Sequence, residues 1–275
     1  VSIQQLQSLY DTVVLSYGAN SDRKLGIKGE DLQGIYSSRQ FVNWYNGHPY
    51  FVDQITDHDF LANESGNVVI IGQGNVAIDC ARILASNIGK LSATDITQHA
   101  LEKLDKFQDR IRNIYIVGRR GAVQASFTNK ELREVISDMN EDCIATINQE
   151  EMLRSTQSEE CQQEMDGSRA VKRKMSIFER AVFDGDEVVR TNEGSKKCVH
   201  FRFLLSPMEF MGDAQGRVNK VRFEKNELFG KVNEQRAKGM NEFVEIDTGL
   251  VLTSIGYKAQ SVSEIESYWD SANNV

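Results

Sequence analysis

One glycine-rich turn in this chain has the residue types and the spacing of a dinucleotide-binding site. Residues 72–77 are Gly-Gln-Gly-Asn-Val-Ala, which fits the pattern G-x-G-x-x-A. In that pattern the first glycine allows a tight turn, the second lets the backbone approach a pyrophosphate, and the small last residue lets a helix pack closely on a strand. The N-terminus of that helix offers unpaired N–H groups and a positive dipole end to the phosphates. We therefore predict that this turn binds a dinucleotide; a turn of purely structural use is the alternative.

Two arginines indicate which dinucleotide is bound. Arg119 and Arg120 stand where an NAD site normally carries an acidic residue for the ribose 2′-hydroxyl. Guanidinium groups can hold a 2′-phosphate with charge-assisted bonds worth about 1.5–3 kcal/mol each, so one such bond favours NADP over NAD by about tenfold or more. The alternative is a solvated charge pair at a strand end. The interval from Gly74 to Arg119 exceeds the usual spacing of about 20 residues, and we attribute the excess to an inserted helix.

The turn and the arginines can act together only if neighbouring parallel strands carry them. Residues 68–71 are Val-Val-Ile-Ile, which is typical of a strand buried on both faces, and an apolar stripe over residues 76–84 predicts the helix that must follow. A capping box at residues 95–98 predicts the inserted helix, and residues 114–117 predict the second strand. Strand, turn, helix and strand form a βαβ unit. We therefore predict an α/β fold with a Rossmann-like NADP-binding domain around a parallel sheet.

Other segments predict the structure around this unit. They are helices over residues 37–45 and 128–139, a buried strand over 12–15, a strand over 250–255 that returns to the sheet, and an antiparallel excursion over 201–205, 218–223 and 243–246.

The composition excludes several classes of function. The 275 residues are 40% hydrophobic and carry a net charge of −8, so the surface as a whole repels nucleic acid and anionic lipid. No apolar run approaches the roughly 20 residues that a bilayer crossing needs, which leaves only peripheral membrane association open. The four cysteines lack metal-ligand or disulfide spacing and favour a reducing compartment, and the four histidines lie in polar sequence typical of surface or turn positions. The chain starts at Val1 without a targeting peptide and ends abruptly, so we expect a fragment.

Four blocks of sequence resemble the adrenodoxin reductase family, the mitochondrial ferredoxin–NADP reductases. The first is residues 69–79, which contain the glycine turn, and the second is residues 117–121 with 127–134, around and after the arginines. Residues 37–47 are similar to that family's inter-domain segment, and residues 252–258 to its returning strand. The blocks occur in the family's order and cover nearly the whole chain.

The resemblance implies a flavoprotein that takes a hydride from NADPH onto FAD and passes single electrons to a ferredoxin. It also implies the site residues: Gln73, Gly74, Asn75 and Val76 line the NADP pyrophosphate beside Gly72, Arg119 and Arg120 hold the 2′-phosphate, and Glu131 is a further NADP contact. Without the resemblance, Glu131 is better interpreted as a solvated residue near a helix N-terminus. We assign no catalytic acid or base, because the cofactors carry the chemistry and the protein positions them.

A basic run interrupts the acidic second half of the chain. Arg169 and Arg173 are four residues apart and share one face of a helix, with Lys172 beside them and Lys174 next in the run. From the residues alone this is a solvated charged face. The resemblance implies that Arg169, Lys172 and Arg173 contact an acidic, adrenodoxin-like iron–sulfur protein, with an attraction that weakens in salt.

The resemblance also divides the chain into domains. Residues 1–64 form a partial FAD-binding domain with the inter-domain segment, residues 65–249 the NADP-binding domain, and residues 250–275 a return to the FAD-binding domain. The family's FAD-binding glycine motif and its late flavin-contacting block have no match here, so we do not expect this chain alone to hold FAD tightly or to turn over. By resemblance the location is the mitochondrial matrix. Two alternatives stay open: a flavin reductase of the glutamate-synthase small-subunit type, and a nucleotide-binding module without a redox role.

Overall fold

The computed structural model describes residues 1–19, 21–61, 64–139, 141–183 and 196–261, and positions 266 and 269. The chain divides into two compact units. The main unit is Gly26–Ser254, and the terminal unit combines Val1–Leu25 with Ile255–Val275. Among the described residues, no helix is both long and apolar enough to cross a bilayer.

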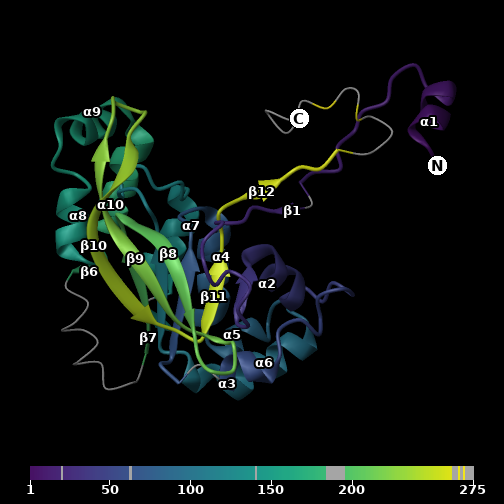
Figure 1. The fold of residues 1–275 in the computed structure, drawn as a ribbon, viewed down its shortest axis with the longest axis horizontal. Coiled ribbons are helices and arrows are strands. Elements are labelled where there is room, and N and C mark those ends of the chain that lie inside the picture. Colours follow the sequence, from purple (N-terminus) through teal and green to yellow (C-terminus); the bar gives the residue numbers. More distant parts are fainter. Residues whose placement is uncertain are drawn as a thin grey trace. The chain divides into compact units, whose positions relative to one another are not determined.

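A parallel sheet forms the centre of the main unit (Figure 1). Its strands, in spatial order, are β2 (Ile35–Ser37), β11 (Leu250–Thr253), β3 (Asn67–Ile71), β4 (Asn113–Val117), β7 (Lys197–Arg202), β5 (Cys143–Ile147) and β6 (Val182–Phe183). Ile71 pairs with Val117, and Val117 pairs with Arg202, so the carboxyl ends of β3, β4 and β7 are level. This confirms the predicted α/β fold with a parallel sheet.

The predicted βαβ unit with its insertion is present. Helix α4 (Asn75–Ala85) follows β3 and buries the expected stripe, including Ala77, Ala81 and Leu84. Helices α5 (Ile88–Leu91) and α6 (Gln98–Phe107) and the short 3₁₀ turn Gln108–Arg110 then precede β4, and they account for the long interval before Arg119. The predicted capping box is wrong: the N-cap of α6 is Thr97, whose hydroxyl donates instead to the carbonyl of Tyr45 at 2.8 Å.

Helix α2 (Ser38–Tyr45) confirms the helix predicted over residues 37–45. Its capping box is formed by Ser37 and Gln40, and Gly47, at φ 73°, turns the chain away after its end. Trp44 is fully buried and stacks on Phe41, so it is a packing residue. Helix α3 (Asp57–Leu61) packs against α6.

Among the described residues, four α-helices follow β4. The helix predicted over residues 128–139 is α7 (Asn129–Arg133), which continues as a π-helical turn over Glu134–Asp138. Helices α8 (Gln149–Arg154), α9 (Glu159–Gly167) and α10 (Arg169–Phe178) come after β5. Phe178 of α10 packs edge-to-face on Phe201 and Phe203, with ring centroids 5.6 and 5.5 Å apart, and this aromatic contact anchors α10 to the end of β7.

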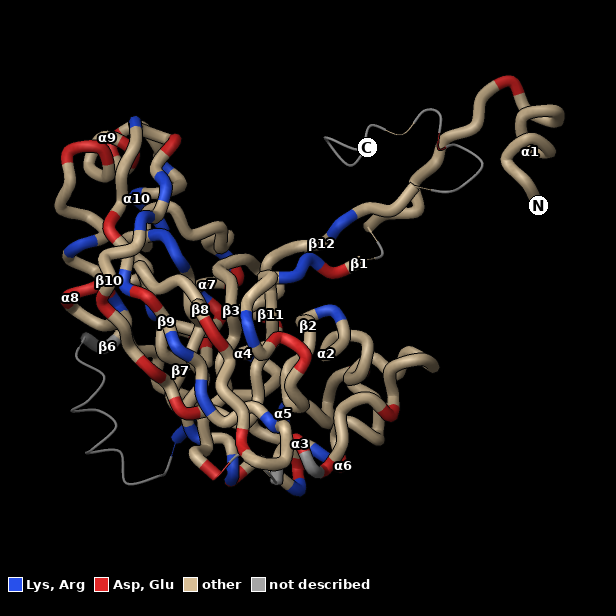
Figure 2. The backbone as a smooth tube through the Cα atoms, in the orientation of Figure 1, with Lys and Arg blue, Asp and Glu red and all other residues tan. Residues whose placement is uncertain are grey.

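Between β7 and β11 in the chain, three strands form a separate antiparallel sheet. Strands β8 (Leu205–Gly212), β9 (Val218–Phe229) and β10 (Arg236–Asp247) form it in the order β10–β9–β8. The excursion was predicted, but assigning residues 201–205 to it was wrong in part, since 201 and 202 end the central parallel strand β7. Lys197, His200 and Arg202 interrupt the apolar pattern of β7 and hide it in the sequence. Basic and acidic residues are interspersed along β9, whereas β10 carries basic residues in its first half and acidic residues in its second (Figure 2).

His200 corrects the prediction that the histidines lie at the surface. Its side chain in β7 is 7% exposed, and its ring stacks on Tyr115 with centroids 4.5 Å apart. Nε2 donates to the Asn113 amide oxygen at 3.1 Å, and Nδ1 accepts from the Thr146 hydroxyl at 2.7 Å. Burial, and then the charge of Arg202, lower the pKa of His200 to about 4, so it is a neutral hydrogen-bonding residue inside the sheet.

The terminal unit contains α1 (Ile3–Leu9) and a two-stranded antiparallel pair, β1 (Ser21–Asp22) with β12 (Tyr257–Lys258). The prediction of a buried strand over residues 12–15 is wrong. This stretch has no regular structure, and Val14 is 82% exposed. An apolar run becomes a strand only beside another strand that pairs its backbone, and the described part of this unit pairs only β1 with β12.

The boundaries at 64/65 and 249/250 between cofactor domains stay a prediction. Strands β2 and β11, from the two flanking stretches, pair with each other, and β11 also pairs with β3. Both flanking stretches therefore contribute a strand to the same sheet as residues 65–249.

Candidate dinucleotide-binding site

The glycine turn has a backbone that requires glycine and leaves room for a ligand. Gly72 has φ 133°, and a Cβ there would collide with the carbonyl of Ser254. The N–H of Gly72 donates to the Val117 carbonyl at 2.8 Å, which ties the turn to the end of β4. Gly74 is the N-cap of α4, and no side chain caps the helix. Apart from the adjacent residues, no atom of the described part of the chain lies within 4 Å of where a Cβ of Gly74 would stand. The first N–H groups of α4 are therefore available to an anion.

The side chains of Gln73 and Asn75 are engaged in holding neighbouring backbone. The Gln73 amide donates to the Arg202 carbonyl at 3.1 Å and passes over Gly118, where a Cβ would overlap it. The Asn75 amide oxygen accepts from the N–H of Thr128 at 2.8 Å. These contacts leave the main-chain N–H groups of the turn as the donors for a phosphate. Nothing in the sequence indicates that residue 118 must be glycine to let the Gln73 side chain pass over it.

The two arginines lie on a loop of residues 118–128 that follows β4, here called the arginine loop. Arg119 is exposed and Arg120 is half-buried. Among the described residues, neither guanidinium forms an ion pair with a carboxylate, although ion pairs are common elsewhere in the chain. The end of β4 lies next to the end of β3, so these two cations follow the strand beside the glycine turn.

Lys174 was expected as the last member of the exposed basic run, and the structure places it inside. It is 6% exposed, and its ammonium donates to the carbonyls of Val123, at 2.9 Å, and Ala125 in the arginine loop. Burial and then the positive charge of Arg120 lower the pKa of Lys174 to about 8. Its place on the helix explains this, since Lys174 falls on the same stripe as the buried Met175 and Phe178.

Glu131 lies on α7, in a small acidic cluster beside α4. One of its carboxylate oxygens is buried and has no hydrogen-bond partner among the described residues, so Glu131 is not the solvated residue that the sequence alone predicts. Arg82 pairs with Asp79 at 3.2 Å and with Glu134 at 2.9 Å. Burial chiefly, and the charges of Glu131 and Glu134 in addition, raise the pKa of Asp79. Glu131 forms no ion pair within the described residues, which leaves its carboxylate able to accept from a ligand.

The basic face of α10 has the predicted geometry. Arg169, Lys172 and Arg173 are all exposed, and the opposite face of the helix is buried. Lys172 pairs with Asp166 of the neighbouring acidic helix α9 at 2.9 Å, in a contact where both side chains are more than half exposed. In Figure 2 acidic stretches lie beside α9 and basic ones beside α10.

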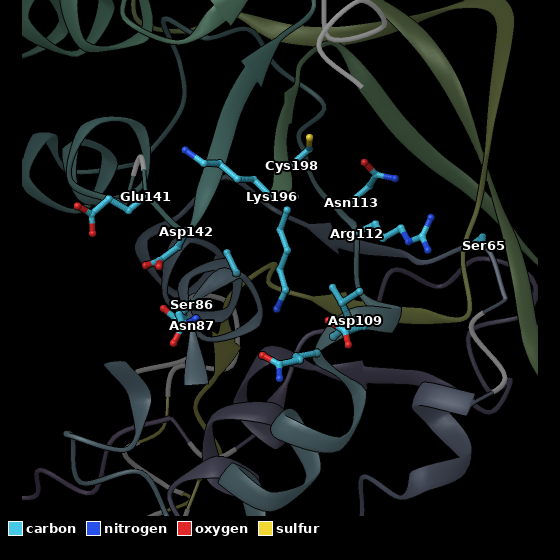
Figure 3. Close-up of a pocket in the computed structure, with 14 residues that line it drawn as sticks. Ser65, Ser86, Asn87, Asp109, Arg112, Asn113, Glu141, Asp142, Lys196 and Cys198 are labelled. Carbon is cyan, nitrogen blue, oxygen red and sulfur yellow. The ribbon is translucent and has the colours of Figure 1, made fainter. Parts of the chain in front are cut away.

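A separate cavity of about 600 Å³ lies at the opposite, amino edge of the sheet (Figure 3). Its charged lining residues are three bases and three acids: Arg112, Lys196, Lys197, Asp109, Glu141 and Asp142. Lys197 donates to the Leu84 carbonyl at the end of α4, at 2.7 Å, and burial lowers its pKa to about 8. The positive and negative side chains that line this cavity are equal in number. The two arginines of the arginine loop, in contrast, have no carboxylate partner among the described residues.

Comparison with known proteins identifies the family. No protein-family model matches the chain. It is 40% identical over 268 residues to a mitochondrial NADPH:adrenodoxin oxidoreductase of Arabidopsis thaliana, a match that covers 96% of this chain and 52% of that protein. It is 35% identical to an NADPH-ferredoxin reductase, FprA, of Mycobacterium leprae, over 92% of this chain and 51% of that protein. The chain belongs to the adrenodoxin reductase family.

The structure of Mycobacterium tuberculosis FprA in complex with NADPH superposes on this member of the family with a TM-score of 0.80 and 32% identity. The match covers 100% of this chain and 56% of that one. The chain thus spans about half the length of the adrenodoxin reductases it matches. None of the relatives cited is a glutamate-synthase subunit or a nucleotide-binding module without redox activity, so the two alternatives gain no support from them.

Proposed function

We propose that this chain is the NADP(H)-binding half of an adrenodoxin-type ferredoxin reductase. One observation carries the proposal. A helix N-terminus without a capping side chain and two arginines that have no carboxylate partner among the described residues follow the ends of neighbouring strands, at the carboxyl edge where open α/β sheets bind their ligands. Residues 65–249 form the NADP-binding domain, and residues 1–64 and 250–275 belong to the FAD-binding domain of the full-length protein. The FAD assignment rests on the family alone.

The glycine turn binds the pyrophosphate through its backbone. Gly72 and Gly74 bring the main chain close to the phosphates, and the N–H groups of Asn75 and Val76 begin α4 and donate to them. Gln73 contributes its main chain, since its amide already holds the Arg202 carbonyl. When bound, NADPH supplies the hydride that reduces a flavin.

The arginine loop selects NADP over NAD. Arg119 and Arg120 bind the 2′-phosphate, and the loop is already held by hydrogen bonds before a ligand arrives. Glu131 accepts a hydrogen bond from the cofactor, which gives its buried carboxylate oxygen a partner.

Calorimetric titration of the chain with NADP⁺ and with NAD⁺ tests this assignment. We expect NADP⁺ to bind at least about tenfold more tightly, and Arg119→Ala with Arg120→Ala to remove that preference while the affinity for NAD⁺ stays unchanged. Arg110→Ala is the matched control, because Arg110 is an exposed arginine in the 3₁₀ turn just before β4 starts, away from the carboxyl edge. Equal affinities of the unmodified chain for the two nucleotides would contradict the assignment.

The basic face of α10 docks an acidic ferredoxin of the full-length protein. The exposed cluster of Arg169, Lys172 and Arg173 stands out on a chain of net charge −8 and can steer an acidic partner. We expect Arg169→Glu with Arg173→Glu to abolish the binding of an adrenodoxin-type [2Fe–2S] ferredoxin at low salt, and Arg110→Glu to leave it intact. Binding that survives the double reversal, or that is insensitive to salt, would exclude this surface.

The full-length protein acts in mitochondria. The support is that the Arabidopsis relative and its bovine counterpart are mitochondrial by name, whereas FprA is bacterial. Fluorescence imaging of the tagged full-length protein in its own cells tests this, and a diffuse cytosolic signal would contradict it.

A further inference from the structure

A single buried asparagine reaches the backbone of both arginines. Asn226 lies on β9 of the antiparallel sheet and is 1% exposed. Its side-chain amide donates to the carbonyl of Arg119 at 2.9 Å. Its own N–H donates to the carbonyl of Leu204 at 2.8 Å, and the N–H of Leu204 donates to the carbonyl of Arg120 at 3.1 Å. One residue, 107 positions away in sequence, therefore holds Arg119 directly and Arg120 through one intermediate residue.

The intermediate residue is held in a conformation that leucine seldom adopts. Leu204 has φ 57° and is 2% exposed, at the point where the chain leaves the parallel sheet for the antiparallel one. A bulky residue in the left-handed region is strained and persists only where its surroundings fix it. Here the surroundings are the hydrogen bonds to Asn226 and Arg120, which aim the N–H of Leu204 at the arginine loop.

Asn226 is itself fixed from two further sides. The second N–H of its amide donates to the Ser206 hydroxyl at 2.8 Å, so both side-chain donors are used. The Arg154 guanidinium donates to its main-chain carbonyl at 2.9 Å, which holds the backbone of β9 at this residue. With the backbone held and both N–H groups of the side-chain amide used, the amide has one orientation, and its hydrogen bond to Arg119 is pre-formed.

We propose that Asn226 is a positioning residue for 2′-phosphate recognition, which makes the antiparallel sheet part of the cofactor-specificity device. The inference rests on the proposed function, in which Arg119 and Arg120 bind that phosphate. Asn226 does not touch the cofactor. It fixes the main chain from which two long, flexible guanidinium side chains project, so that less freedom is lost when they close on the phosphate.

This role predicts a loss of selectivity rather than a general loss of binding. Truncation of the Asn226 side chain to alanine frees the carbonyl of Arg119 and the hydroxyl of Ser206, while the main-chain N–H of residue 226 still donates to the Leu204 carbonyl. It leaves the glycine turn untouched, because that turn is held by Val117, Arg202 and Ser254. A merely structural role would weaken every nucleotide equally. The probes are 2′,5′-ADP and 5′-AMP, which differ in the 2′-phosphate.

The experiment is a titration of the chain, its Asn226→Ala variant and an Asn219→Ala control with both probes. Asn219 lies on the same strand β9 with an exposed side chain. We expect Asn226→Ala to weaken 2′,5′-ADP by about tenfold and to change 5′-AMP by less than about twofold, while Asn219→Ala changes neither. Should Asn226→Ala fail to give a cooperative melt, Ser206→Ala decides, because it frees the amide of Asn226 and is expected to weaken 2′,5′-ADP by about threefold.

Three results would overturn the inference. Unchanged 2′,5′-ADP affinity in folded Asn226→Ala, or in Ser206→Ala where that variant decides, removes the positioning role alone. Equal weakening of both probes assigns Asn226 a structural role only. If the unmodified chain binds 2′,5′-ADP no more tightly than 5′-AMP, the proposed function fails together with this inference. The titration of the unmodified chain alone shows this outcome, so it is distinguishable from a failure of the positioning role.

Discussion

The two edges of the central sheet arrange their charges in opposite ways. At the carboxyl edge, Arg119 and Arg120 have no carboxylate partner among the described residues, and α4 begins without a capping side chain. At the amino edge, a larger set of charged residues lines a cavity of about 600 Å³, with three bases facing three acids. The carboxyl edge therefore has positive charge that is available to a ligand, whereas the charges at the amino edge neutralise one another.

The difference shows that a cavity is a weaker sign of a binding site than unmatched polar groups. Lys197 at the amino edge is half-buried and Lys174 behind the arginine loop is buried, and desolvation lowers the pKa of each to about 8. Lys197 caps the carbonyl end of α4, whereas Lys174 holds two carbonyls of the arginine loop. The same residue type therefore completes a helix at one edge and shapes a ligand-binding loop at the other.

Replacing a glycine at each edge is expected to give the largest effect. Gly72→Ala at the carboxyl edge places a Cβ against the Ser254 carbonyl at a φ of 133°, and we expect it to cost about 3 kcal/mol or more of folding free energy. Gly66→Ala, before β3 starts, meets the Arg110 carbonyl at 3.1 Å and has φ 70°, a region open to other residues at about 1–2 kcal/mol. Denaturant unfolding measures both, and equal losses would contradict the distinction.

The pH dependence of stability tests the two lysines whose pKa is lowered, Lys174 and Lys197. A lysine whose folded pKa is about 8 and whose unfolded pKa is near 10.5 binds fewer protons when folded between those values, so stability rises with pH across that window. We expect this rise to be about 1–2 kcal/mol for each lysine, less than the full shift because the side chains retain some hydration.

Two single variants check this expectation. Lys197→Met and Lys174→Met should each reduce the increase in unfolding free energy between pH 8 and pH 10.5. Only Lys174→Met should also weaken NADP⁺ binding, because only Lys174 contacts the arginine loop. An unchanged pH slope in Lys197→Met would mean that its ammonium is hydrated in the folded protein.

The sequence predicts the elements that are local and regular. The apolar run at residues 68–71, the stripe of α4 and the glycine turn between them depend on neighbours a few residues away, and all are present in the structure. The run at 12–15 is also mostly apolar, but no strand of the described residues pairs with it, so the local pattern alone was insufficient. Strand β7 was concealed because its polar side chains are satisfied by distant partners, as His200 is by Thr146 and Asn113.

The supporting residues of the candidate site are the part that sequence could not supply. Arg119 and Arg120 follow a motif and were recognisable from it. Asn226 lies in a strand without a motif, and only the fold brings it to the Arg119 carbonyl. Helical periodicity could have predicted that Lys174 is buried, since it lies on the same face of α10 as Met175 and Phe178. The basic residues around it in the sequence indicated an exposed position instead.

The smallest expected effect tests whether the amino-edge cavity binds anions at all. Arg112 lines that cavity with Lys196 and Lys197, so an anion site there would depend on its guanidinium. Because Asp109, Glu141 and Asp142 supply equal negative charge, we expect no binding of pyrophosphate at this edge. Arg112→Ala should then change the unfolding free energy by less than about 0.5 kcal/mol and leave the NADP⁺ and pyrophosphate affinities unchanged, as measured by calorimetry. A pyrophosphate affinity that falls in Arg112→Ala but persists in Arg119→Ala with Arg120→Ala would place an anion site at the amino edge, and the contrast between the two edges would fail.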